Sequence, residues 1–126
     1  MTIVELTYAV SRLLPPEERY ELSAQMRKAA VSIPSNVAEG FARGTPRACA
    51  HFTKIAVGSM AELETQLEVV RRLKFVAVEA VQPLQDVLDR ERQILHGLRR
   101  NRERQVAVSA GSLLLWLALT NACLLT

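Results

Sequence analysis

Apolar residues return every three or four positions along most of the chain, which is the spacing that places them on one face of an α-helix. No stretch alternates between apolar and polar residues for long enough to indicate a β-strand. The pattern predicts amphipathic helices over residues 2–14, from about 17 to 41, 46–73 and 78–104. We therefore expect an all-α protein.

Prolines and a glycine separate the predicted helices. Pro15 and Pro16 end the first helix, because the residue before a proline is pushed out of helical backbone angles. Gly44, Thr45 and Pro46 follow the order of C-cap region, N-cap and first helical position that is expected between two helices. Helices joined by such short connections pack as an antiparallel, up-down four-helix bundle.

Each helix has an apolar stripe that we expect to face the core. The predicted inward residues are Ile3, Leu6, Val10 and Leu13; Leu22, Met26, Ala29, Ile33, Val37 and Phe41; Phe52, Ile55, Ala56, Ser59, Leu63, Leu67 and Val70; and Val81, Leu84, Leu88, Leu95 and Leu98. Together they predict one continuous core along the bundle.

Pro34 lies inside the apolar stripe of the second helix. Proline lacks a backbone N–H and crowds the carbonyl of Ala30, so we predict that the second helix kinks here without ending. Ser32, Ser35 and Asn36 can supply polar groups to the freed backbone.

Gly58 and Ser59 place two small residues in the middle of the third helix. A glycine at such a position destabilises a helix by about 1 kcal/mol relative to alanine. Small side chains also let a neighbouring helix come close, so we predict a close helix–helix approach at this point.

The C-terminal segment differs in composition from the rest. Residues 105–126 carry no charge, and 15 of residues 106–126 are apolar. We therefore divide the chain into a bundle domain, 1–104, and an apolar extension, 105–126. A membrane span needs about 20 apolar residues, and Thr120 and Asn121 interrupt this one. We favour an extension packed on the bundle or between subunits over a membrane span.

The net charge of +3 is unevenly distributed. Residues 1–89 carry a net −1, residues 90–104 carry +4 and residues 105–126 carry none. The basic character of the protein therefore belongs to the last part of the predicted fourth helix.

The length of 126 residues suits one domain. Cys49 and Cys123 are too few for a disulfide framework, which favours reduced thiols. Glu5 and Arg12 lie within the first predicted helix, where a signal peptide would be apolar. We expect a cytoplasmic protein.

Catalytic groups form no recognisable pattern in this sequence. His51 and His96 have no cysteine or carboxylate partners at the spacing of metal ligands. No glycine-rich loop that could cradle phosphates is present. We expect no enzymatic activity, no cofactor and no bound metal.

Two segments carry a family resemblance. They are EERYELSAQMRKAAVSIPSNVAEGFAR, residues 17–43, and HFTKIAVGSMAELETQLEVVRRL, residues 51–73, and ILHGL at 94–98 fits the pattern that closes the family's last helix. The chain resembles the bacterial four-helix bundle proteins encoded by intervening sequences in 23S rRNA genes. Residues 105–126 have no counterpart in that family.

The resemblance implies a left-handed, up-down four-helix bundle that assembles as a homopentamer. It also implies kinship with accessory variability proteins of diversity-generating retroelements, which use this scaffold to bind a reverse transcriptase and nucleic acid. No enzymatic activity is established for the family, and its cellular role is largely unknown.

Polar and small residues of the resembling segments form a candidate structural or interface motif. We expect them to hold the kink and to contribute to a contact between subunits, provided that their buried polar groups are paired. The motif consists of Gln25, Arg27, Ser32, Pro34, Asn36, Glu39, Gly58, Ser59 and Glu62. The alternative is a recognition surface on which Arg27, Lys28, Arg43 and Arg47 meet phosphates.

The predicted fourth helix carries the better nucleic-acid candidates, namely Arg92, Arg99, Arg100, Arg102 and Arg104. Arginine suits phosphate recognition. The aromatic residues are few and spread along the chain, so the sequence indicates no base-stacking platform. We expect binding that is mainly electrostatic and independent of sequence.

Three hypotheses of function follow. The first is a non-enzymatic, oligomeric bundle that associates with RNA or with an RNA-processing partner. The second is a protein-interaction scaffold that does not bind nucleic acid. The third and weakest is a bundle tethered to a membrane.

Overall fold

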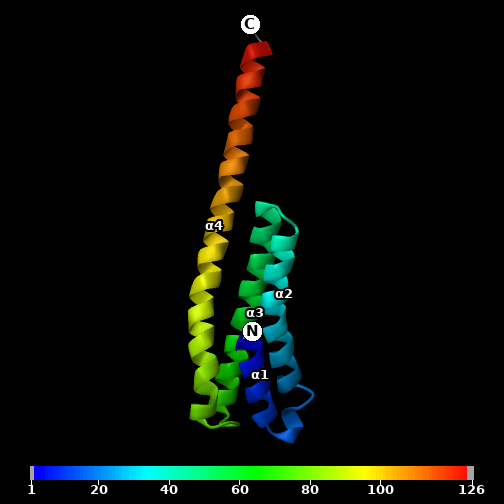
Figure 1. Ribbon diagram of the computed structural model, residues 1–126, viewed down its shortest axis with the longest axis vertical. Coiled ribbons are helices and arrows are strands. Elements are labelled where there is room, and N and C mark those ends of the chain that lie inside the picture. The colour runs from blue at the N-terminus through cyan, green and yellow to red at the C-terminus, as the bar shows by residue number, and fades with distance from the viewer. Residues whose placement is uncertain (1, 125–126) are drawn as a thin grey trace.

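The computed structural model describes the backbone of residues 2–124 and the side-chain environments of residues 3–112 and Leu114. The described chain is helical and contains no strand. The elements are α1 Thr2–Leu13, the short 3₁₀ helix η1 Pro16–Glu18, α2 Leu22–Ala42, α3 Pro46–Arg72 and α4 Val78–Leu124 (Figure 1).

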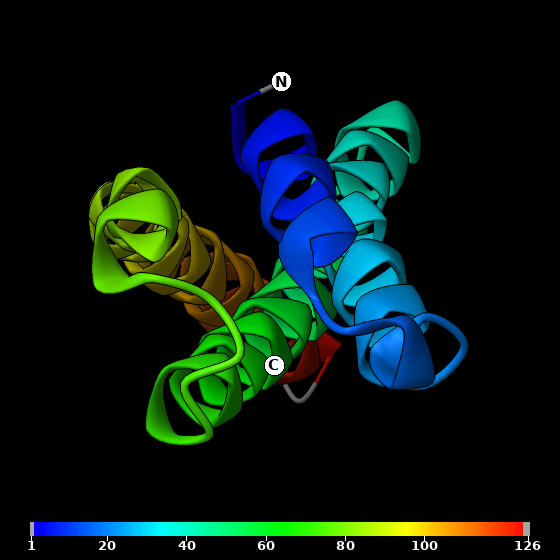
Figure 2. The same ribbon diagram turned by 90° about the horizontal axis from the view of Figure 1, so that it is seen from below.

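The four α-helices form an up-down bundle, as the sequence predicts. Helices that follow each other in the chain pack side by side and run in opposite directions, and α1 also packs on α4 (Figures 1 and 2). With 12 residues against the 21 of α2, α1 lies only along the lower part of the bundle in Figure 1. The upper part is therefore built from α2, α3 and α4.

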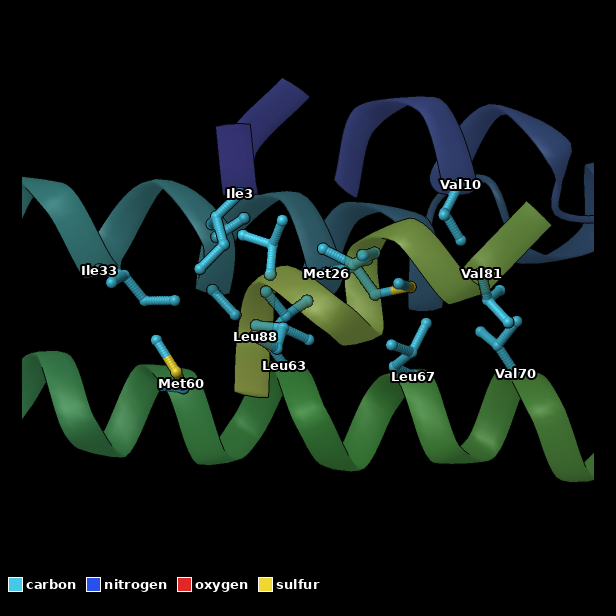
Figure 3. Close-up of a cluster of buried hydrophobic side chains, with 14 of the residues drawn as sticks. Ile3, Val10, Met26, Ile33, Met60, Leu63, Leu67, Val70, Val81 and Leu88 are labelled. Carbon is cyan, nitrogen blue, oxygen red and sulfur yellow. The ribbon is translucent and has the colours of Figure 1, made fainter. Parts of the chain in front are cut away.

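The core runs along the axis of the bundle and draws on all four helices (Figure 3). Met26, Leu63, Leu67 and Leu88 are fully buried there. Burial of one such side chain stabilises the fold by about 1.5–3 kcal/mol relative to exposure, so this cluster is the main source of stability.

The buried positions of α3 follow a seven-residue repeat. Apart from Gln66, which is also buried, they are Cys49, Thr53, Ala56, Met60, Leu63, Leu67 and Val70. This alternation of four- and three-residue steps is typical of helices that supercoil around each other. It includes Thr53 and Met60, which the predicted stripe omits, and it excludes Ile55, which is 40% exposed.

The core prediction is also wrong for two other residues. Leu13 is 56% exposed and Phe41 is 50% exposed. Both lie in the last turn of their helices, where the chain leaves the bundle. At the end of α1 it is Leu14, the residue after the helix, that is buried.

The second helix begins later than predicted. Residues 16–18 form η1, in which the N–H of Glu18 bonds to the carbonyl of Pro15 at 2.9 Å, and α2 begins at Leu22. Acidic side chains favour any helix N-terminus, and Glu17 and Glu18 lie in the tight turn that reverses the chain between α1 and α2.

Helix α2 continues through Pro34 as predicted. Ser35 Oγ donates to the carbonyl of Val31 at 2.8 Å, and Asn36 Nδ2 donates to that of Ser32 at 2.8 Å. The polar side chains next to the proline thus bond the two carbonyls that follow Ala30, not the carbonyl of Ala30 itself.

The start of α3 matches the prediction. Thr45 is the N-cap, its Oγ1 accepts a hydrogen bond from the N–H of Ala48 at 3.1 Å, and Pro46 is the first helical residue. Gly44 has a φ of +73°, which glycine adopts without strain. These three residues make a short, well-defined connection between α2 and α3.

The fourth helix does not end at residue 104. It continues as one helix to Leu124 and leaves the bundle beyond the α2–α3 connection (Figure 1). Val108 and Leu114 are each 68% exposed. The extension is therefore not packed on its own bundle over the described positions.

Several expectations about the extension concern side chains outside those that the structure describes. These include the polar interruptions at Thr120 and Asn121 and the thiol of Cys123. Within the described part of the chain, no helix combines the length and the apolar character needed to cross a bilayer.

Candidate nucleic-acid interface

Arg102 links α4 to the connection between α2 and α3. Its guanidinium carbon lies 5.2 Å from the centre of the Phe41 ring. Arg102 and Phe41 also line one shallow hollow, of about 220 Å³, together with Gly44, Thr45 and Pro46. The end of the bundle domain thus lies beside a turn that is distant in the sequence.

Arg43, at the end of α2, makes a similar arginine–aromatic contact with Phe52 of α3. Its guanidinium carbon lies 5.5 Å from the centre of the Phe52 ring, and its Nε donates to Glu39 Oε1 at 2.8 Å. Arginine above an aromatic face gains up to about 1 kcal/mol at exposed sites. The upper end of the bundle therefore holds two such pairs.

We call this region the basic end. It comprises Arg43, Arg47, Arg99, Arg100, Arg102 and Arg104, with Glu39 and Glu103 as its acidic residues. Four of the five predicted α4 candidates, all but Arg92, thus lie at the same end of the bundle as the arginines near the α2–α3 connection.

A close approach between α2 and α3 shapes the basic end. Gly40 is buried, and a Cβ atom there would lie 3.1 Å from both Cys49 Cα and Phe52 Cβ. Only glycine leaves room for this approach without a shift of backbone. Phe52 thereby lies within reach of Arg43, one turn further along α2.

Some of these arginines have carboxylate partners. Arg99 Nε lies 3.6 Å from Glu103 Oε1. Arg100 and Arg104 are exposed and have no ion-pair partner among the described residues. Exposed ion pairs contribute only about 0–1 kcal/mol, so a phosphate can replace such a carboxylate at little cost.

Arg92 does not belong to this region. Its Nε lies 3.7 Å from Glu64 Oε1 on α3, and its Nη2 lies 3.4 Å from Asp89 Oδ1. Arg92 therefore lies between carboxylates of α3 and α4, about two helical turns before Arg99.

The alternative surface of Arg27, Lys28, Arg43 and Arg47 does not form. Arg27 lies toward the lower end of α2, with its guanidinium carbon 5.6 Å from the centre of the Tyr8 ring of α1. At 1.5 Å per residue, Arg43 lies about 24 Å further along α2.

The motif of polar and small residues separates into a half-buried part between α2 and α3 and an exposed part. Ser32 Oγ lies 2.7 Å from Ser59 Oγ, which joins α2 to α3. Asn36 Nδ2 donates to Ser32 Oγ at 2.9 Å. These three side chains form the polar seam, beside Pro34.

The remaining motif residues lie elsewhere. Gln25, Glu39 and Glu62 are exposed, and Glu62 accepts a hydrogen bond from Gln66 on its own helix at 3.2 Å. Gly58 is also exposed, and a Cβ atom there would meet nothing within 4 Å. The close approach predicted at Gly58 and Ser59 is made by Ser59, which contacts Ser32 of α2, while Gly58 faces open space. A closer approach of the two backbones lies at Gly40.

Comparison with known families decides the affiliation. The family model described as 23S rRNA-intervening sequence protein matches residues 1–97. The chain belongs to this family. No curated protein matches it significantly.

Family membership confirms the resemblance stated from the sequence. The match to the 23S rRNA-intervening sequence family includes the polar seam, Gly40 and Arg43. Arg99, Arg100, Arg102 and Arg104 follow the matched residues. The basic end therefore combines the part of the chain that matches the family with a part that does not.

Phe41 and Phe52 are functional candidates that sequence reasoning missed. The apolar stripes of the sequence place both residues in the core. Their pairing with Arg102 and Arg43 depends on contacts between helices, for which the linear pattern has no signal. Gly40 had a visible signal, because a glycine within a helical pattern often marks a close backbone approach.

The described residues offer little else for chemistry. No group of three or more histidine, cysteine or carboxylate side chains is arranged to hold a metal ion within the described part of the chain. His51 packs edge-on against Phe52, with ring centres 5.1 Å apart.

Proposed function

We propose that this member of the 23S rRNA-intervening sequence family is a non-enzymatic, oligomeric bundle that associates with RNA, or with an RNA-processing partner, in the cytoplasm. The contact of Arg102 with Phe41 carries this proposal. It brings α4 beside the α2–α3 connection, so that Arg99, Arg100, Arg102 and Arg104 of α4 lie at the same end of the bundle as Arg43 and Arg47.

The chemistry of the basic end suits the RNA backbone. Arginine pairs with phosphate through two parallel hydrogen bonds. Phe41 is half-exposed beside Arg102, and an unpaired base can stack on such a pair. Binding of this kind depends on charge and not on base sequence.

Assembly would strengthen such binding. The homopentamer implied by the family resemblance would carry about +15, since each copy carries +3. Several basic ends on one particle raise the avidity for a long polyanion without any new contact. The mass of the purified protein in solution tests the pentamer directly.

RNA binding measured over a range of salt concentrations tests the function. We expect the logarithm of the binding constant to fall linearly with the logarithm of salt concentration. The double variant Arg100→Gln, Arg104→Gln should bind more weakly and reduce the slope by about 2. Binding that ignores salt, or no binding at low salt, would contradict the proposal.

Arg71→Gln, Arg72→Gln is the matched control. It removes the same charge from the other end of the bundle, where both arginines pair with Glu68. We expect it to lower the affinity much less. An equal loss in the two variants would mean that net charge alone determines binding.

A protein-interaction scaffold is the second candidate. An apolar groove of about 320 Å³ lies beside Pro34, between α1, α2 and α4, and Ile94 in its wall is 58% exposed. Val37 and Leu98 also line it. Co-purification of one protein that nuclease treatment does not remove, and that Ile94→Glu abolishes, would favour this function.

A further inference from the structure

A second basic site lies at the opposite end of the bundle. Where α1 turns into α2, a hollow of about 570 Å³ opens to solvent. Its polar lining consists of Ser11, Arg12, Arg19, Tyr20, Ser23 and Arg27. None of the arginines there belongs to the basic end.

Three arginines reach this hollow from three parts of the chain. Arg12 is in the last turn of α1, Arg19 follows η1, and Arg27 is in the second turn of α2. Arg12 and Arg19 have no ion-pair partner among the described residues.

Carboxylates are nearby but do not line the hollow. Glu17, Glu18 and Glu21 belong to the same connection, and none of them is part of the lining. The described residues that form the wall therefore carry three positive charges and no negative one.

Hydrogen bonds hold this wall in place. Ser23 Oγ donates to the carbonyl of Ser11 at 3.1 Å and joins α2 to α1. Arg27 Nε donates to the carbonyl of Ser23 at 3.1 Å, and the Tyr8 ring supports the guanidinium. The terminal amino groups of Arg27 have no partner among the described residues.

The start of α2 adds backbone donors. The first hydrogen bond within the helix runs from the N–H of Gln25 to the carbonyl of Glu21, whose side chain makes no capping bond. The N–H groups of the first turn are therefore not used by the helix. Ser23 and Ala24 of that turn line the hollow.

We infer that this hollow is a phosphomonoester site, which binds the terminal phosphate of a nucleotide or of an RNA 5′ end. A terminal phosphate carries up to about two negative charges and three acceptor oxygens, which match three arginines better than a singly charged internal phosphodiester does. The volume lies within the range of small-ligand sites, about 300–1,000 Å³.

Tyr20 supplies a surface for the attached base. It lines the hollow and is 85% exposed. Stacking of a base on an aromatic side chain tolerates any base. The site would therefore recognise the phosphorylated end of a nucleic acid without selecting a base sequence. For an RNA end, this inference deepens the proposed function and rests on it.

Two oligoribonucleotides of one sequence, with 5′-phosphate and with 5′-hydroxyl, test the inference on the full chain. We expect the phosphorylated form to bind about tenfold more tightly, since hydrogen bonds to charged groups are strong. Arg12→Gln, Arg19→Gln should abolish this preference and should lower the affinity for the 5′-hydroxyl form no more than Arg71→Gln, Arg72→Gln does. Both residues are exposed, so the fold should tolerate the change.

The same control, Arg71→Gln, Arg72→Gln, should keep the preference. Equal affinity of the wild-type protein for the two oligoribonucleotides would overturn the RNA-end site, while the proposed function would stand if both bind. Loss of the preference in the control variant would also overturn it.

Adenosine monophosphate and adenosine distinguish the two sources of phosphate. Monophosphate binding that Arg12→Gln, Arg19→Gln removes, without any RNA binding, would assign the site to free nucleotides and refute the proposed function. If neither the monophosphate nor the phosphorylated RNA binds better than its unphosphorylated counterpart, the site does not exist.

Discussion

Ser32 and Ser59 bring their hydroxyl oxygens to 2.7 Å across the contact between α2 and α3. Each hydroxyl has one proton to donate. Asn36 donates to Ser32 Oγ, and Ser59 Oγ donates to the carbonyl of Ile55 at 3.2 Å. Ser32 is therefore the donor to Ser59, and these hydrogen bonds form a chain that runs in one direction, from the Asn36 side chain to the Ile55 carbonyl.

Replacement of Ser59 by alanine tests this chain of hydrogen bonds. The Ser32 proton would lose its acceptor, so we expect Ser59→Ala to lower the free energy of unfolding by about 1–2 kcal/mol. Urea unfolding gives the value. Thr65→Ala is the control, because Thr65 is exposed and bonds only to the Ala61 carbonyl of its own helix. A Ser59→Ala cost no larger than that of the control would contradict the directed chain.

Two glycine substitutions should have opposite effects. Gly40→Ala would place a Cβ atom 3.1 Å from Cys49 Cα, so α2 and α3 must separate. We expect a loss of about 1–3 kcal/mol, as in other overpacked cores. Gly58→Ala fills open space on α3 and should stabilise by about 0.5–1 kcal/mol.

Thermal unfolding of the two variants measures the contrast. A destabilising Gly58→Ala, with a change in the mass of the assembly, would place Gly58 at a contact between subunits. A harmless Gly40→Ala would contradict the close approach of the two helices.

Glu68 should titrate below its ordinary pKa of 4.5, chiefly because Arg72 donates a hydrogen bond to it, with a smaller contribution from the charge of Arg71. A lowered pKa in the folded state means that the charged carboxylate favours folding above pH 4.5. That contribution is lost as the pH falls through the lowered pKa.

Arg72→Gln should raise the pKa of Glu68 toward 4.5, which an NMR titration of its side-chain carboxyl measures directly. Arg71→Gln should raise it less. The fall in melting temperature between neutral and acidic pH should become slightly smaller in Arg72→Gln. An unchanged pKa in that variant would mean that the hydrogen bond does not cause the shift.

Removal of residues 105–126 should leave the bundle folded. The described positions of the extension lie outside the core, so we expect nearly the same melting temperature and cooperative unfolding by circular dichroism. Removal of residues 95–126 is the contrasting variant. It deletes the buried Leu95 and should destabilise by several kcal/mol.

The mass in solution of the protein without residues 105–126 then shows whether the extension contributes to assembly. An assembly that survives the loss of residues 105–126 makes the extension an accessory element. A smaller assembly makes it an interface between subunits.

The sequence predicted the helices and their order because apolar period, capping residues and prolines act locally. Thr45 and Pro46 start α3 as their residue types require. The predicted start of α2 at Glu17 and Glu18 is wrong because acidic residues favour a 3₁₀ turn as readily as the first turn of an α-helix. The predicted end of α4 is wrong because residue 104 marks a change in composition and not a break in the helix.

The site was less predictable than the fold. The sequence located the arginines of α4, but the Arg102–Phe41 and Arg43–Phe52 pairs depend on how three helices pack. The predicted stripe does not include Thr53, because a stripe of apolar residues leaves out a polar residue at a buried heptad position. Such contacts become visible only in three dimensions.

The length of α4 gives any ring of these bundles a direction. Residues 105–124 would extend about 30 Å as a helix, and in a ring whose rotation axis runs along the bundle, every copy projects this helix from the same side. The arginines of the basic end would encircle the base of that projection, while the Tyr20 hollows would open on the reverse side. Such a particle would have two chemically different faces. One would carry the arginines of the basic end around the projecting apolar helices, and the other would carry the Tyr20 hollows.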